Sequence, residues 1–196
     1  MCSSDLEEAL VDFALALTRD SNDAALLINR GNALVALDRN DAAISSFDRA
    51  LTFRPNHADT WFGRGKALKN LGRLETALAS YGRAIAIDPD HAEAFLHRGD
   101  VFYGLKRLAE ALADYDKAIA LNPGLSDAHQ GRARALFDLR RGEEAAAAFD
   151  VAFQLAPDAD YLEGIRLLTK MYICDWADLA PERNRLIAHV LEGKNA

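Results

Sequence analysis

Apolar positions along the chain follow a helical period and come in blocks of two. In residues 58–91 the first stripe is spaced by three and four positions, as on one face of an α-helix: Trp61, Gly65, Leu68 and Leu71. Gly72 and Arg73 predict a turn, and a second stripe follows at Leu74, Ala77, Leu78, Tyr81, Ala84 and Ile85. Asp88-Pro89 predicts the end of the second helix, because proline disfavours helix at the preceding residue and lacks an N–H.

This two-helix block recurs every 34 residues. The recurring columns are proline (Pro55, Pro89, Pro123, Pro157), an aromatic ring (Phe47, Tyr81, Tyr115, Phe149) and two alanines (Ala43, Ala77, Ala111, Ala145; Ala50, Ala84, Ala118, Ala152). A 34-residue helix–turn–helix period with these columns is typical of one repeat class. The sequence therefore resembles the tetratricopeptide-repeat (TPR) family over about residues 24–157.

The resemblance implies an all-α fold, namely a right-handed superhelical solenoid of antiparallel helix pairs. Its four units would be 24–57, 58–91, 92–125 and 126–159. The small columns have a steric explanation, since Gly65 and Ala77 allow two helix backbones to approach closely. The ring of Tyr81 would fill the space beside that contact.

Both ends depart from the repeat. Residues 1–23 match a second helix whose first helix is missing, so its apolar stripe should be partly exposed: Leu6, Leu10, Phe13 and Leu17. Either the chain was cut here or another chain covers the stripe, and a homodimer through this helix is one hypothesis. Residues 158–196 predict capping helices, one over 159–173 and a last one carrying Leu186, Ile187, Val190 and Leu191.

A second resemblance lies in this tail. Cys174-Asp175-Trp176, followed by Asp178 and the basic residues Arg183 and Arg185, is similar to the segment that joins repeats to the catalytic domain in O-linked N-acetylglucosamine transferases and SPINDLY-like proteins. The resemblance implies a substrate-recognition arm of such a glycosyltransferase. The sugar-nucleotide domain is absent from these 196 residues, so we expect no transferase activity from them.

Composition and charge limit the classes of partner that the chain is expected to bind. The chain is 50% hydrophobic and 27% charged, with a formal net charge of −7 and no basic run. This balance predicts a globular protein that binds neither nucleic acid nor an anionic membrane. No apolar run reaches the roughly 20 residues of a membrane-spanning helix, and the acidic N-terminus does not resemble a signal peptide. A cytoplasmic location is the simplest expectation.

Nothing in the sequence predicts catalysis, a cofactor or a metal site. The nucleotide-binding, zinc-protease and nucleophile-elbow motifs are all missing. His57 and His91 are equivalent places one repeat apart, too far to share a metal. An arginine column (Arg30, Arg64, Arg98, Arg132) fits either a phosphate ladder or side chains packed along the helix pairs, and we favour the packed arrangement.

The TPR resemblance also implies a concave surface lined by fixed places of each first helix. The candidate groove residues are Ile28, Asn32, Phe62, Lys66, Lys69, Leu96, Asp100, Tyr103, Gln130, Arg134 and Phe137. Exposed apolar side chains rimmed by charge mark an interaction surface, although neighbouring units can also bury them. We expect a scaffold that binds a peptide or protein segment. The glycosyltransferase arm is the alternative, and a self-assembling module is a third hypothesis.

Overall fold

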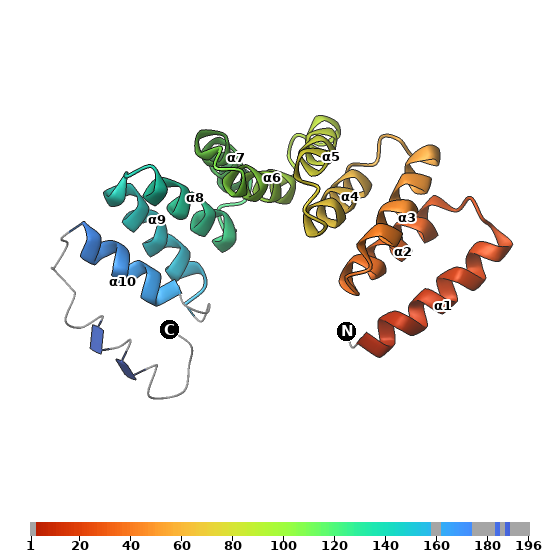
Figure 1. Ribbon diagram of the computed structural model, residues 1–196, viewed down its shortest axis with the longest axis horizontal. Helices are drawn as coiled ribbons and strands as arrows, with labels where there is room; N and C mark the ends of the chain where they lie inside the picture. The colour runs from red at the N-terminus through yellow and green to blue at the C-terminus, as the bar shows by residue number, and fades with distance from the viewer. Residues whose placement is uncertain (1–2, 158–161, 174–182, 185–186, 189–196) are drawn as a thin grey trace. The chain divides into compact units, whose positions relative to one another are not determined.

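The computed structural model describes residues 3–157, 162–173, 183–184 and 187–188, and in this part of the chain it contains ten α-helices and no strand (Figure 1). The helices are α1 (Ser3–Arg19), α2 (Ala24–Ala36), α3 (Asn40–Phe53), α4 (Ala58–Asn70), α5 (Leu74–Ile87), α6 (Ala92–Gly104), α7 (Leu108–Leu121), α8 (Ser126–Asp138), α9 (Gly142–Leu155) and α10 (Leu162–Tyr172). The predicted Cys174-Asp175-Trp176 motif and Leu186, Val190 and Leu191 of the predicted last helix lie outside the described residues.

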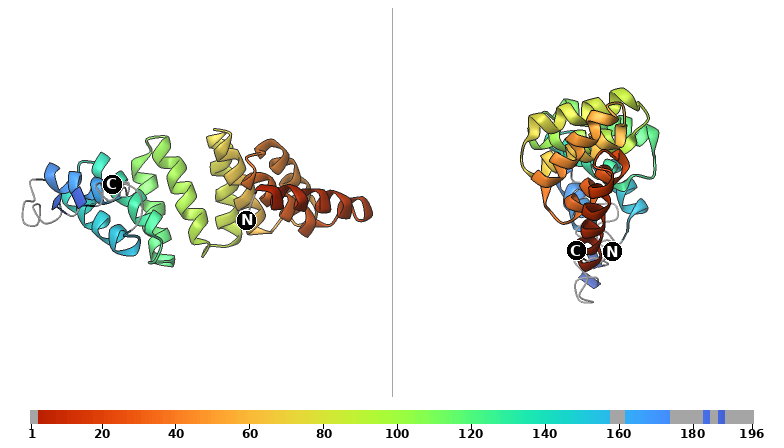
Figure 2. Two further views of the ribbon diagram at one scale, coloured as in Figure 1. Left: turned by 90° about the horizontal axis from the view of Figure 1, so that it is seen from below. Right: turned by 90° about the vertical axis from the view of Figure 1, so that its right-hand side faces the viewer.

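The chain divides into two compact units, residues 1–101 and 102–196, and the division falls inside α6. In unit 1, α2 pairs with α3 and α4 pairs with α5, while α1 packs on α2 and α3 packs on α4. In unit 2, α8 pairs with α9, and α7 and α10 pack on the two members of that pair. The helices of each unit lie side by side in Figure 2. The predicted all-α fold of antiparallel helix pairs is confirmed.

Each complete first helix ends in the same way. In unit 1, Asp38 and Gly72 have positive φ angles of 57° and 70°, and in unit 2, Lys106 and Arg140 have φ angles of 59° and 63°. The next residue donates a backbone hydrogen bond to the carbonyl five residues earlier, for example from Arg73 to the carbonyl of Leu68 at 2.9 Å. This pattern is a Schellman motif, which satisfies free carbonyls at the helix end and reverses the chain. Gly72 is the one residue of the four that adopts this angle without steric cost.

The core is built from the recurring small and aromatic columns. Phe47, Tyr81 and Tyr115 are fully buried, as are the alanines of both alanine columns. The ring of Tyr81 occupies the space above Gly65, where an added Cβ would lie 2.6 Å from Cε1 of Tyr81. Phe47 stands in the same relation to Gly31, at 2.5 Å. Tyr115 instead covers Gly131 of the following first helix, α8, as Phe47 also covers Gly63 of α4. The close approach expected from the sequence is therefore a contact between a backbone and an aromatic face.

The arginine column ties neighbouring helices together rather than presenting cations to a phosphate. Arg64 donates from Nε to Oδ1 of Asp48 at 2.6 Å and from Nη1 to the hydroxyl of Ser80 at 2.8 Å, so it joins α3, α4 and α5. Two other arginines of the column make one of these bonds each, Arg30 to Ser46 and Arg132 to Asp116. Arg166, one 34-residue step further and outside the predicted column, bonds to Asp150. These bonds match the packed arrangement that we favoured.

The N-terminal helix is less exposed on its predicted stripe than expected. Leu10 is buried, because α2 covers it, and Leu17 packs against Leu27 and Ile28. Its exposed apolar residues are Val11 and Leu15, at 67% and 58%. The expectation of a partly exposed stripe was therefore wrong for Leu10, whereas Leu6, Phe13 and Leu17 are partly exposed as expected.

The glycine contact can be tested with a matched pair of substitutions. We expect Gly65→Ala to lower the free energy of unfolding by about 1–3 kcal/mol, because the buried ring of Tyr81 has no room to move. Gly82→Ala on α5 should instead raise it by up to about 1 kcal/mol, since no atom lies within 4 Å and alanine favours helix. Urea denaturation gives the free energy of unfolding of both variants. Equal changes in the two variants would contradict the close packing of Tyr81 on Gly65.

The arginine column gives a second test. Arg64→Ala should lower the free energy of unfolding by about 1–2 kcal/mol, because two charge-assisted bonds at a half-buried side chain are lost. Arg73→Ala is the control, since its pair with Asp41 at 3.0 Å is largely exposed on both sides and should contribute less than about 0.5 kcal/mol. Thermal unfolding of the two variants compares them. A loss for Arg64→Ala no larger than for the control would show that the column does not stabilise the stack.

Candidate functional site

The candidate groove residues belong to first helices, and the structure distributes them over the two units. We call the side of the first helices that carries them the inner face of each unit. Phe62, Lys66 and Lys69 come from α4 and Asp100 from α6, all in unit 1. Gln130, Arg134 and Phe137 come from α8 in unit 2. Tyr103 also belongs to unit 2, although it lies on the same helix as Asp100. We describe the surface of each unit separately.

Two of the predicted groove residues are not available to a ligand. Ile28 is 9% exposed and Leu96 is 6% exposed, so neighbouring helices cover both side chains. Ile28 belongs to a core cluster with Leu27 and Ala50, against which Leu17 of α1 packs. The prediction that these two side chains line an open groove is therefore wrong, and each contributes to the core instead.

In unit 1, the face between α4 and α6 carries an aromatic and charged cluster. The Phe62 ring lies 4.8 Å from the ring of His91 and 5.4 Å from the ring of His97, measured between centroids. The Lys66 ammonium lies 5.6 Å above the Phe62 ring, within cation–π distance. These contacts bring together residues that the sequence placed on one stripe.

The second lysine of this cluster is paired within the protein. Lys69 Nζ lies 3.5 Å from Oδ2 of Asp100 and 3.4 Å from Nδ1 of His97. The same Asp100 oxygen lies 3.4 Å from Nδ1 of His97. Lys69 and Asp100 therefore partly neutralise each other, whereas Lys66 forms no ion pair with any described residue. Of the two lysines, Lys66 is the better candidate for a ligand carboxylate.

The histidines of the repeat turns have local roles. His57 Nδ1 lies 2.9 Å from the Thr60 hydroxyl, and His91 Nδ1 accepts from the backbone N–H of Ala94 at 3.3 Å. Each of these side chains thus contacts the first turn of the helix that follows it. Within the described residues, no three His, Cys, Asp or Glu side chains cluster as metal ligands would.

A second hollow of unit 1 lies between α1 and α2. This groove of about 370 Å³ has an apolar floor that includes Leu6, Phe13 and Ala33. Asn29 and Asn32 stand at its edge, and both are exposed. Carboxamide groups both donate and accept, so the pair suits the backbone of an extended segment. The sequence singled out Asn32 but did not join it to α1, because α1 was interpreted as an uncovered end.

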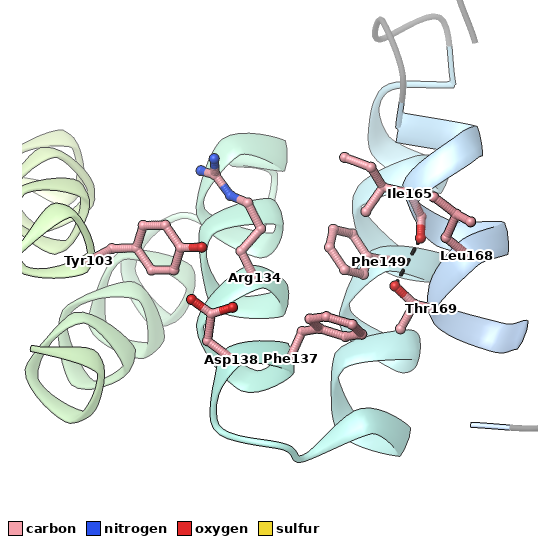
Figure 3. Close-up of a pocket in the computed structure, with 8 residues that line it drawn as sticks. All are labelled: Tyr103, Arg134, Phe137, Asp138, Phe149, Ile165, Leu168 and Thr169. Atoms are coloured by element: carbon pink, nitrogen blue, oxygen red, sulfur yellow. Dashed lines mark hydrogen bonds between the residues drawn. The ribbon is translucent and has the colours of Figure 1, made fainter. Parts of the chain in front are cut away.

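Unit 2 contains a pocket of about 200 Å³ at the inner face of α8 (Figure 3). Phe137, Phe149, Ile165 and Leu168 form its apolar walls, and Thr169 completes the α10 side. On the opposite side, Tyr103 points its hydroxyl toward α8, beside Arg134 and Asp138 (Figure 3). The sequence predicted Tyr103, Arg134 and Phe137 as groove residues. It missed Ile165 and Leu168, because the fifth first helix was interpreted as a cap.

The polar rim of this pocket is asymmetric. The Tyr103 hydroxyl faces the Asp138 carboxylate (Figure 3), and Lys106 Nζ lies 3.4 Å from Oδ2 of Asp138. Burial raises the pKa of Tyr103, and the Asp138 carboxylate raises it further, while the charges of Lys106 and Arg134 act in the opposite direction. Arg134 is exposed, lies 5.4 Å from the Tyr103 ring, and has no carboxylate partner among the described residues. The rim therefore presents one guanidinium whose charge is not neutralised locally.

A comparison with known protein families agrees with the repeated helix pairs. A family model for the tetratricopeptide repeat matches residues 3–58, 28–90 and 62–126, which together exceed half of the chain. The chain therefore belongs to the tetratricopeptide-repeat family. No curated protein sequence matches it. No helix in the described ranges is long and apolar enough to cross a membrane.

Solved structures of similar fold include PilF, MamA and YrrB. PilF of Pseudomonas aeruginosa is 19% identical with a TM-score of 0.82, and the alignment covers 93% of this chain and 83% of PilF. MamA of Desulfovibrio magneticus RS-1 is 19% identical with a TM-score of 0.75, covering 84% and 93%. YrrB, described as a TPR protein with an unusual peptide-binding site, is 20% identical with a TM-score of 0.72, covering 90% and 91%. At these identities the likeness establishes the fold alone.

Tyr81 lies beneath the aromatic and charged cluster of unit 1, and its burial can be tested by measuring stability at different pH values. Its hydroxyl is buried and has no hydrogen-bond partner among the described residues, and burial raises its pKa, with a further contribution from Asp100. The pKa of Tyr81 is therefore higher in the folded protein than in the unfolded chain. As a result, the contribution of the neutral hydroxyl to the free energy of unfolding is complete below about pH 10 and decreases as the pH rises further.

We therefore expect Tyr81→Phe to leave the free energy of unfolding at pH 8 unchanged or to raise it by about 1 kcal/mol, since no hydrogen bond is lost. The variant should also lose less stability than the parent between pH 8 and pH 11. Phenylalanine is the natural residue at the equivalent places 47 and 149. Urea denaturation at both pH values checks this, and a clear loss at pH 8 would reveal an unseen partner of the hydroxyl.

Proposed function

We propose that this protein is a non-catalytic scaffold that holds a peptide or protein segment against the inner faces of its first helices. The observation that carries the proposal is the pocket of unit 2, where apolar walls stay open beside a guanidinium without a carboxylate partner among the described residues. A surface that combines an apolar hollow with a polar rim is suited to a polypeptide side chain and its neighbours. The peptide-binding site named for YrrB supports the same use of the fold.

The charge of the protein supports a polypeptide partner over nucleic acid or membrane lipid. The net charge is −7, and much of the basic charge is engaged with Asp or Glu, as in Lys69–Asp100 and Arg141–Glu144. Phosphate-binding surfaces instead present several unpaired cations together. A cytoplasmic location is part of the proposal and is compatible with these partners.

The proposal includes the absence of enzymatic activity. The exposed charged groups on the inner faces form ion pairs or contact aromatic rings, such as Lys106 with Asp138 and Lys66 with Phe62. Catalysis needs a nucleophile or base within hydrogen-bond reach of a group that activates it. In the part of the chain that the structure describes, the candidate groove offers hydroxyls and carboxylates that already serve structural contacts.

The alternative function is a substrate-recognition arm of a glycosyltransferase similar to O-linked N-acetylglucosamine transferases. The sequence Cys174-Asp175-Trp176 favours it. The codons downstream of Ala196 distinguish the two possibilities, since several hundred further codons would favour the arm. A third possibility is pairing through the exposed Val11 and Leu15 of α1, which light scattering over a range of protein concentrations would detect.

The scaffold proposal is tested by selecting peptides from a random display library on the full chain. Phe62→Ala combined with Tyr103→Ala should weaken selected binders by about 2 kcal/mol or more, roughly 30-fold, because aromatic anchors dominate binding energy. Phe53→Ala is the matched control, since Phe53 is exposed at the end of α3, a second helix. Fluorescence anisotropy gives the affinities, and circular dichroism verifies folding. Folded double mutants that bind like the parent would remove the inner faces from the proposal.

A further inference from the structure

The unit 2 pocket has the size of a single side chain. Its volume is about 200 Å³. An apolar cavity of about 150 Å³ accepts a benzene ring, whereas sites for drug-sized molecules occupy roughly 300–1,000 Å³. The pocket therefore fits one large aliphatic or aromatic side chain better than a free metabolite.

The walls of the pocket favour an apolar occupant. Phe149 is 2% exposed, and Phe137 and Ile165 pack on the same core cluster. The one hydroxyl on the α10 side, that of Thr169, donates to the carbonyl of Ile165 at 2.8 Å and is already satisfied. A polar group entering here would lose hydrogen bonds to water without replacement. Leu168, 65% exposed, would be covered by an apolar occupant, which favours binding.

The rim of the pocket favours a carboxylate next to that side chain. Asp138 is paired with Lys106, so the remaining charge at the rim is the guanidinium of Arg134. A second arginine lies beyond Phe137: Arg140 donates to the hydroxyl of Tyr172 at 2.5 Å, and the Tyr172 ring lies 5.1 Å from that of Phe137. Neither arginine has a carboxylate partner among the described residues. Guanidinium and carboxylate form strong, often bidentate pairs.

We propose that unit 2 selects a segment in which a large apolar side chain stands beside an aspartate or glutamate. The apolar side chain fills the pocket, and the neighbouring carboxylate pairs with Arg134. This inference rests on the proposed function, because it specifies which polypeptide the inner face accepts. The net charge of −7 does not oppose it, since at physiological salt charges more than about 8 Å apart are largely screened.

The experiment uses peptides displayed as internal segments, so that the carboxylate comes from a side chain and not from a free chain end. The full chain should enrich sequences with Asp or Glu adjacent to Leu, Ile, Met or Phe. Replacing the apolar residue of a selected peptide with serine, or its acid with lysine, should weaken binding about tenfold each.

Two protein variants connect the motif to the pocket. Arg134→Glu should reverse the charge preference, so that the lysine peptide binds more tightly than the acidic one. Leu168→Ser should weaken every peptide with the apolar residue. The matched controls are Arg83→Glu, because Arg83 also lies over an aromatic ring, 5.8 Å from Trp61, and Leu155→Ser, because Leu155 is 43% exposed on α9. Both controls should bind like the parent.

The outcomes separate this inference from the proposed function. Selected peptides that tolerate both peptide changes and both pocket variants, but that are weakened by Phe62→Ala alone, overturn the inference and leave the scaffold function standing. A library that yields no binder overturns both. A homodimer that Leu168→Ser dissociates assigns the pocket to a second copy of the chain, and this too overturns the inference.

Discussion

The contact between an aromatic ring of a second helix and a glycine backbone of a first helix sets the helix spacing on which the rest of the structure depends. Phe47 covers Gly31, Tyr81 covers Gly65, and Tyr115 covers Gly131, in each case closely enough that a Cβ has no room. Protein interiors are packed as densely as organic crystals, so even a small change in side-chain volume at this contact should change the stability of the fold. In α2, α4 and α8 the helix face that carries the glycine is occupied by this contact, so the residue types on the opposite face can vary.

The inner faces of the two units carry different side chains and therefore different surfaces. In unit 1, Lys69, His97 and Asp100 satisfy one another around the Phe62 ring, which leaves a surface whose charges are mostly balanced. In unit 2, the side chains of α8 and α10 leave an apolar hollow with an unneutralised arginine at its rim. The first surface is suited to broad contact and the second to an anchor. Specific recognition commonly combines a few anchors with a complementary surround.

Much of the fold could be predicted from the sequence, because the 34-residue step places the same residue type in the same environment each time. The proline column predicted where α3, α5, α7 and α9 end, and the small columns predicted where helices approach. Burial was harder to predict on the inner stripe. Ile28 and Leu96 occupy the same repeat position as Phe62, yet adjoining helices bury Ile28 and Leu96. Periodicity predicts on which side of a helix a side chain lies, but it does not predict how deeply that side chain is buried. The roles of Phe13 and Leu168 were also missed, because residues at the ends of the repeat array acquire their function from neighbours outside the pattern.

Amide hydrogen exchange with and without a selected peptide tests the central claim most directly. If a polypeptide binds the inner faces, protection should increase in the first helices, above all in α8 and α10, and the second helices α3, α5 and α9 should change little. Protection that increases mainly in the second helices, or nowhere along the described chain, would contradict the account.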